Sequence, residues 1–215
     1  LIFRAMATDY YPRLSSISKS LNDSHRLVNQ QAELVIIILG PILATFMIFV
    51  NWLIWLLYSD QFAGIEVMLY WAALGMYFKG ASWAVAYILL TQNNPKLFFW
   101  NELLANGYIL GFNILGYWIA GLEGLGISFT VGYLFYFIQV FAVNKINYFF
   151  QFTSEFIKIF SVQFLIGFMC FLLIILKVNK PYVLGLLLIS ASICYSYYLL
   201  NKKMDITVSL KKFFR

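Results

Sequence analysis

The sequence predicts an all-α protein, a polytopic transmembrane helical bundle of about six spans. Hydrophobic residues make up 62% of the 215 residues and charged residues only 11%, whereas soluble domains average about 45–50% and about 25%. Mean hydropathy is +0.80. The apolar residues fall in long unbroken runs, which favour spanning helices over the alternating pattern of a β-barrel. This composition excludes a soluble globule, a disordered tail and a nucleic-acid-binding module, despite the net charge of +6.

Residues 1–33 precede the first apolar run and are predicted to form a cytoplasmic connector. The chain begins at Leu1 without the pattern of a signal peptide, so we expect a segment from inside a longer protein. Leu14, Ile17, Leu21 and Val28 recur at helical spacing between polar residues. This spacing predicts an amphipathic helix over residues 14–28 that lies at the membrane interface and continues into the first span. The alternative is an ordinary solvated connector.

Apolar segments fill most of the remaining chain, and each is long enough to cross about 30 Å of hydrocarbon. Short links with Gly, Asn and Pro separate them, so neighbouring helices are expected to run antiparallel. Pro41 removes one helix hydrogen bond and predicts a kink in the first span. Single amides within spans, such as Gln163, are expected to bond neighbouring helices. The predicted spans are Leu34–Tyr58, Val67–Leu90, Leu97–Ala120, Gly126–Asn144, Ile159–Leu176 and Tyr182–Leu200.

The distribution of Lys and Arg predicts the orientation. If residues 1–33 lie in the cytoplasm, 12 of the 15 basic residues fall on that side. Only Lys177 and Lys180 fall in outer links, and Lys79 lies within a span. Because cytoplasmic loops carry an excess of Lys and Arg, this orientation is favoured. Six spans then return the basic residues 201–215 to the cytoplasm.

Lys79 lies near the middle of the second predicted span. A cation at that depth costs about 2.5–3.5 kcal/mol on insertion scales, so it should face the bundle interior or a wet cavity. One interpretation is a contact for an anionic substrate group. The other is a structural ion pair with a carboxylate of a neighbouring helix.

A polar stripe follows the third predicted span. Glu102, Asn106, Asn113 and Tyr117 fall within about a 60° sector at 100° per residue. Such a stripe either lines an aqueous path or bonds neighbouring helices. Glu102, close to the cytoplasmic end, could carry a proton or a sodium ion, or could reach the interface.

Motifs of enzyme chemistry are missing from this sequence. It has one histidine, no Cys/His metal spacing, no Walker loop and no nucleophile elbow. Cys170 and Cys194 lie in apolar runs, where cysteine is usually a small packing residue. We therefore expect no catalytic residues and no metal site.

One segment resembles a known family. The residues AMATDYYPRLS at positions 5–15 are similar to the connector of bacterial O-antigen translocases, which are polysaccharide flippases of the superfamily that includes the multidrug and toxin extrusion transporters. VNQQAE at 28–33, GMYFK at 75–79 and GLEGLG at 121–126 agree with it. The similarity covers about residues 1–145. Its most specific part is the connector motif, made of Asp9, Tyr10, Tyr11, Pro12 and Arg13.

The resemblance implies a transporter of twelve or fourteen helices in two similar halves around a central cavity. Residues 34–144 would supply four helices of the second half. Residues 145–200 would form a cytoplasmic link and an extra pair of helices, and residues 201–215 a basic cytoplasmic tail. The implied substrate is a polyprenyl-pyrophosphate-linked oligosaccharide, moved from the cytoplasmic to the outer leaflet of the bacterial inner membrane. Membrane lipid, a polysaccharide polymerase and other assembly proteins are the further partners expected, and nucleic acid is not.

For such a substrate, Lys79 would contact the pyrophosphate, and Glu102, Asn106, Asn113 and Tyr117 would form a polar wall for the glycan. Two alternatives remain open. The chain could belong to a drug or metabolite cation antiporter of the same fold, or to a non-transporting scaffold for glycan assembly. No cofactor is expected in any of the three, apart from a coupling proton or sodium ion.

Overall fold

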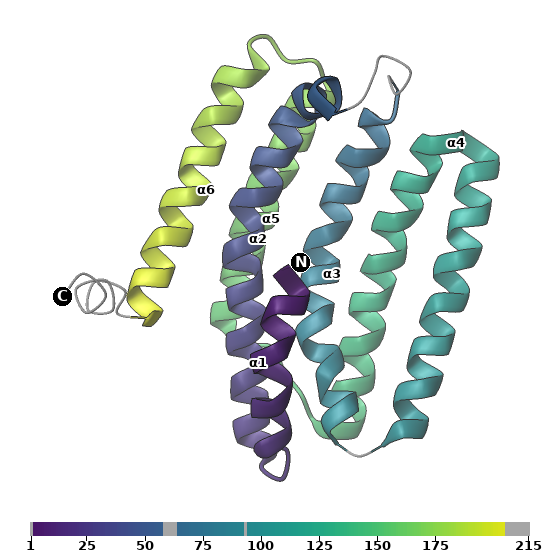
Figure 1. The fold of residues 1–215 in the computed structure, drawn as a ribbon, viewed down its shortest axis with the longest axis vertical. Helices are drawn as coiled ribbons and strands as arrows, with labels where there is room; N and C mark the ends of the chain where they lie inside the picture. Colours follow the sequence, from purple (N-terminus) through teal and green to yellow (C-terminus); the bar gives the residue numbers. More distant parts are fainter. Residues whose placement is uncertain (1, 58–63, 93, 205–215) are drawn as a thin grey trace.

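The computed structural model describes residues 2–57, 64–92 and 94–204, and every element in these ranges is helical. The basic tail predicted at 201–215 therefore lies mostly outside the described residues. Figure 1 shows the helices as long upright rods in one bundle. They are α1 Ile2–Ser16, α2 Leu21–Leu57, α3 Glu66–Thr91, α4 Pro95–Tyr148, α5 Ser154–Ile175 and α6 Pro181–Met204.

Five helices, α2 to α6, are long and apolar enough to cross a membrane. One of them, α4, is divided near its middle, because Ala120 and Gly121 have non-helical backbone angles and Gly121 has a φ of +59°. Only glycine adopts such a φ readily. Figure 1 shows the two arms of α4 side by side and antiparallel. These arms, residues 95–119 and 122–148, correspond to the third and fourth predicted spans.

The N-terminal region differs from the prediction. The helix expected over residues 14–28 is broken, because α1 ends at Ser16 and α2 begins at Leu21. The serines between them form a turn: Ser18 Oγ donates to the Ser15 carbonyl at 2.9 Å, and Ser20 Oγ accepts from the Asp23 amide at 3.4 Å. Serine side chains compete with the helix for backbone groups in this way. The prediction of one continuous helix over residues 14–28 was therefore wrong, although its second part does continue into the first predicted span as α2.

Instead, α1 packs upright against the bundle (Figure 1). Leu14 of α1 and Val28 of α2 are both fully buried in one cluster with residues of α3 and α4. Two of the four apolar residues that the sequence placed on one helical face therefore come together across the turn, whereas Leu21 is exposed.

The helix α2 lies at the centre of the bundle, in contact with α3, α5 and α6. The second arm of α4 packs on α3, where Thr130 Oγ1 donates to the Trp71 carbonyl at 2.5 Å. The first arm lies at the edge of the bundle (Figure 1), and most of its large apolar side chains, such as Trp118, are exposed. Such an exposed apolar face fits contact with lipid or with further helices.

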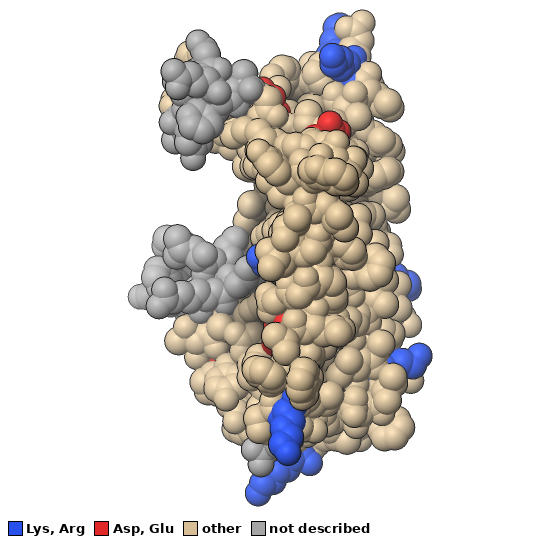
Figure 2. Space-filling model, turned by 90° about the vertical axis from the view of Figure 1, so that its right-hand side faces the viewer, with Lys and Arg blue, Asp and Glu red and all other residues tan. Residues whose placement is uncertain are grey.

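Charge is unevenly distributed along the bundle. In Figure 2, Lys and Arg side chains concentrate toward the lower end, apart from a group at the upper end. The lower end carries the α1–α2 turn and the α4–α5 link, and the upper end carries the α5–α6 link (Figure 1). This is the asymmetry on which the predicted orientation rests.

Candidate functional site

A cavity of about 290 Å³ opens between α3 and the two arms of α4. Polar and aromatic side chains of α3 and of both arms of α4 line it. The lining residues from α3 are Lys79, Ser82, Trp83, Ala86, Tyr87 and Leu90. Those from α4 are Phe98, Glu102, Ala105, Asn106, Ile109, Tyr133 and Tyr136.

Lys79 lies midway along α3 and is partly buried. Its Nζ lies 4.7 Å from the ring centroid of Tyr133 and 5.5 Å from that of Phe129, both on the second arm of α4. Aromatic faces attract a cation through the ring quadrupole, and more strongly away from water. Within the described residues, no carboxylate lies within ion-pair distance of Lys79. In this part of the chain, the expected alternative of a structural ion pair is therefore not found.

Glu102 supplies the negative charge of the cavity. Its Oε1 accepts hydrogen bonds from Tyr136 Oη at 2.6 Å and from Asn101 Nδ2 at 3.1 Å. Asn101 is held in turn by Gln139, whose Nε2 donates to the Asn101 side chain and carbonyl at 2.9 Å. Gln139 thus bonds the two arms of α4, as expected for a single amide in a span. The result is a carboxylate that the protein holds in place beside the cavity.

The predicted polar stripe is divided by the structure. Asn106 lines the same cavity as Lys79 and Glu102, and its Nδ2 donates to the Glu102 carbonyl at 2.8 Å. Asn113 and Tyr117 line a different hollow, nearer the turn of the α4 hairpin. The structure therefore brings three of the five predicted substrate-binding residues together.

Contact between the two arms of α4 separates these two groups. Ser128 Oγ donates to the Phe112 carbonyl at 2.7 Å, and Gly132 lets Ile109 approach closely. The stripe lies on one helical face, but the second arm packs against the first at Ile109 and Phe112, between Asn106 and Asn113. Helical spacing correctly places the four stripe residues on one face of the first arm. It does not show which neighbouring helix covers part of that face.

One residue of the connector motif, Tyr10, packs behind the cavity wall without lining the cavity. Tyr10 is buried, and its Oη donates to the Ala84 carbonyl of α3 at 2.8 Å. Its ring contacts those of Trp83 and Tyr87, which line the cavity. Burial raises the pKa of the Tyr10 phenol, so it stays neutral and remains a donor.

The other motif residues lie outside the cavity. Tyr11 and Pro12 are exposed, and Arg13 pairs with Asp9 at 3.1 Å one helical turn away, where both side chains are exposed. An exposed pair of this kind contributes little stability. Tyr10 is therefore the motif residue with a clear packing role.

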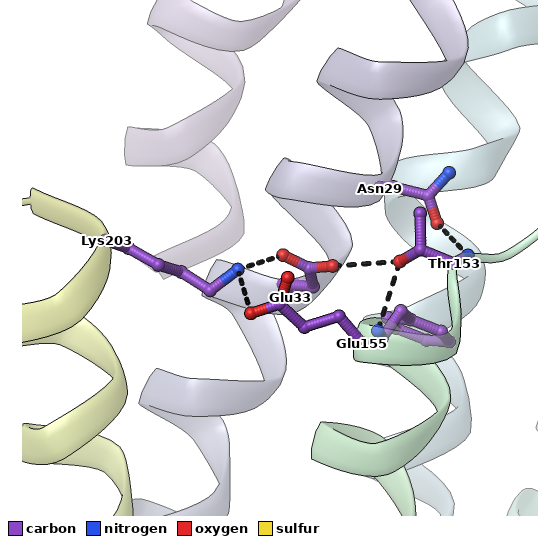
Figure 3. A network of polar contacts seen from close by, with 6 residues as sticks. Asn29, Glu33, Thr153, Glu155 and Lys203 are labelled. Carbon is purple, nitrogen blue, oxygen red and sulfur yellow. Dashed lines mark hydrogen bonds and ion pairs between the residues drawn. The ribbon is translucent and has the colours of Figure 1, made fainter.

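A second polar cluster was missed from the sequence (Figure 3). The Glu33 side chain of α2 is almost fully buried, and it accepts hydrogen bonds from Lys203 of α6 and from Thr153 Oγ1 at 3.0 Å. Lys203 also pairs with Glu155 at 3.3 Å. Asn29 Oδ1 accepts from the Thr153 amide at 2.9 Å. The cluster connects α2, α5 and α6 through residues up to 170 positions apart, a separation that no sequence spacing reveals.

Within the described residues, no group of three or more His, Cys, Asp or Glu side chains could hold a metal ion. Comparisons with protein-family models, with curated proteins and with solved structures give no match.

Proposed function

We propose that this chain is part of a membrane transporter that flips a polyprenyl-pyrophosphate-linked oligosaccharide, an O-antigen or related repeat unit, from the cytoplasmic to the outer leaflet. The observation that carries the proposal is Lys79, a mid-span cation with no carboxylate partner in the described residues, placed at a cavity with Glu102 and Asn106. A charged side chain at that depth is expensive and generally marks a substrate or ion pathway. The resemblance of residues 5–15 supports the same class of transporter.

The chemistry of the cavity suits the polar end of such a lipid. Lys79 would attract the pyrophosphate. Glu102 would accept hydrogen bonds from sugar hydroxyls, and Asn106 would donate hydrogen bonds to them. Tyr133 and Tyr136 offer ring faces beside them. Together these groups would replace the water that the headgroup loses, while the isoprenoid tail stays in the bilayer.

The volume of about 290 Å³ is at the lower limit of ordinary ligand pockets. It suits a pyrophosphate with adjoining groups, not a whole oligosaccharide. The glycan would occupy the larger chamber between two halves that the proposed MATE-like fold contains. Rocking of one half against the other would then expose Lys79 to each side of the membrane in turn.

The proposed location is the bacterial inner membrane, with the N-terminal segment and the C-terminal tail in the cytoplasm. The excess of basic residues at the lower end of the bundle supports this orientation. A coupling proton or sodium ion would bind at Glu102, whose carboxylate already accepts two hydrogen bonds.

Flipping in proteoliposomes tests the proposal. The full-length protein is reconstituted with a fluorescent polyprenyl-pyrophosphate oligosaccharide, and its transfer between leaflets is followed by quenching from outside. We expect Lys79→Met to slow transfer at least tenfold and Lys79→Arg to keep most of it. Lys96→Met is the matched control, because Lys96 is exposed at the start of α4. Transfer at the normal rate by Lys79→Met would exclude Lys79 from substrate binding.

The same cavity gives a specific reason to consider a cation antiporter. Glu102 lies among aromatic rings, and carboxylates with aromatic faces bind organic cations well. Uptake of a cationic dye that depends on Glu102 but improves in Lys79→Met would favour this second function. Failure of both assays, with assembly proteins still bound, would favour the non-transporting scaffold.

A further inference from the structure

The helix α2 contains a proline in its membrane-spanning part. Proline has no backbone N–H, so it cannot donate to the carbonyl four residues earlier, and its ring crowds that carbonyl. For Pro41 this acceptor is the carbonyl of Ile37. In hydrocarbon an unsatisfied carbonyl is costly, so another donor must be found.

Ser196 of α6 supplies that donor. Its Oγ donates to the Ile37 carbonyl at 2.7 Å, although the two residues are 159 positions apart. Ser196 is buried, with 5% of its surface exposed. The hydrogen bond that Pro41 removes from α2 is therefore replaced by a side chain of the last helix.

Ser196 is itself held by a polar chain between α5 and α6. Gln163 Nε2 donates to Ser196 Oγ at 2.7 Å, and Ser192 Oγ donates to Gln163 Oε1 at 2.6 Å. Gln163 and Ser192 are completely buried. We refer to Gln163, Ser192 and Ser196 together as the α5–α6 brace. Gln163 thus bonds neighbouring helices, as its sequence position predicted.

The packing around Pro41 keeps the brace close to α2. Gly40 lies directly against Gln163, and a Cβ at Gly40 would overlap the Gln163 amide. On another side, Tyr77 Oη of α3 donates to the Gly40 carbonyl at 3.3 Å. Thr45 Oγ1 donates to the Pro41 carbonyl at 2.8 Å, a type of bond that bends helices. The proline turn is therefore the point where α3, α5 and α6 all contact α2.

We infer that Pro41 is a hinge of α2 and that the α5–α6 brace holds this hinge in one conformation. With the Ser196 bond in place, the Ile37 carbonyl is satisfied and α2 stays continuous from Leu21 to Leu57. When that bond opens, the two parts of α2 on either side of Pro41 lose their link and can change angle. The last two helices thereby control the conformation of the central helix of the bundle, whatever the substrate is.

Hydrogen–deuterium exchange of the full-length protein in nanodiscs tests this inference. Removing one hydrogen bond should raise the local opening population several-fold, so we expect Ser196→Ala to speed exchange of the α2 amides at residues 38–40 and 42–45 about fivefold. Ser190→Ala is the matched control, because the Ser190 hydroxyl is on the same helix, is exposed and bonds only Leu186 of its own helix at 2.8 Å. This control should exchange at the normal rate.

The Ser196→Ala substitution in a Pro41→Ala variant shows whether Ser196 acts through the proline or stabilises α2 in general. In Pro41→Ala, the new N–H can donate to Ile37 within α2, so adding Ser196→Ala should change exchange less than twofold. The inference is overturned if Ser196→Ala behaves like Ser190→Ala. It is also overturned if the fivefold effect persists in the Pro41→Ala background, because Ser196 would then act independently of the proline.

Discussion

The Lys203→Met substitution should destabilise the bundle more than any other single change in the cluster of Figure 3. The Glu33 side chain is 4% exposed and the Lys203 side chain 20%. Removing one partner of a buried ion pair costs about 3–5 kcal/mol, because the remaining charge stays buried. Thr153 still donates to Glu33 at 3.0 Å, so we expect the lower end of this range, about 3 kcal/mol.

Two further variants show whether the buried pair is responsible. Adding Glu33→Gln to Lys203→Met removes the stranded charge, so the double variant should recover about 2 kcal/mol of that loss, a coupling typical of contacting residues. Glu155→Gln is the matched control for the other partner of Lys203. The Glu155 side chain is 50% exposed, and an ion pair of this exposure contributes at most about 1 kcal/mol.

The free energy of unfolding is measured by titrating SDS into mixed micelles and following tryptophan fluorescence. Only one rank order in this series fits the structure: Lys203→Met least stable, the double variant intermediate, Glu155→Gln near wild type. If Lys203→Met unfolds within 0.5 kcal/mol of wild type, or if the double variant is no better, Glu33 is not held by a buried pair.

Three other changes test how the helices pack. Gly116→Ala should destabilise the α4 hairpin by about 2–3 kcal/mol, because the new Cβ would overlap the Gly124 backbone. Gly107→Ala is the control, because a Cβ at Gly107 would have no atom within 4 Å. In the same SDS titration it should be neutral or stabilising by up to about 1 kcal/mol. Tyr10→Phe should cost about 1–3 kcal/mol, because the Ala84 carbonyl loses its extra donor. If the SDS midpoint of Tyr10→Phe is unchanged, the Tyr10 side chain holds α1 through its ring contacts and its hydroxyl adds nothing.

The spanning helices could be predicted closely from the sequence. The second predicted span, Val67–Leu90, differs from α3 by one residue at each end. This accuracy has a physical reason, because a lipid-facing backbone must satisfy its hydrogen bonds internally and therefore has to be helical along each apolar run. Segments outside the apolar runs have no such constraint, and there the serine turn before Leu21 was missed.

The site could be predicted only in part, because helical periodicity says which residues share a face and not which neighbour covers that face. Glu102 and Asn106 line the same cavity as Lys79, because α3 lies beside the part of the first arm of α4 that carries them. Asn113 and Tyr117 share the same face but lie beyond the contacts of the second arm with Ile109 and Phe112. Glu33 and Lys203 come together through the packing of three helices, which depends on every loop between them.

The buried polar residues of the described chain differ in how completely their hydrogen bonds are satisfied. In the α5–α6 brace, both polar atoms of the Gln163 amide have partners, and the serines on either side of it donate hydrogen bonds. Elsewhere in the described residues, buried polar atoms without a partner lie on α4, at Tyr108 Oη, Asn113 Oδ1 and Asn144 Oδ1, and also on α2 and α6, at His25 Nε2 and Asn201 Oδ1. Unsatisfied polar groups are too costly to persist in dry hydrocarbon unless water or a ligand reaches them. The α5–α6 brace therefore has the properties of a structural support. The unpartnered atoms occur on α2, α4 and α6, so they do not single out the α3–α4 side, and the proposal for that side depends on Lys79 and its surroundings.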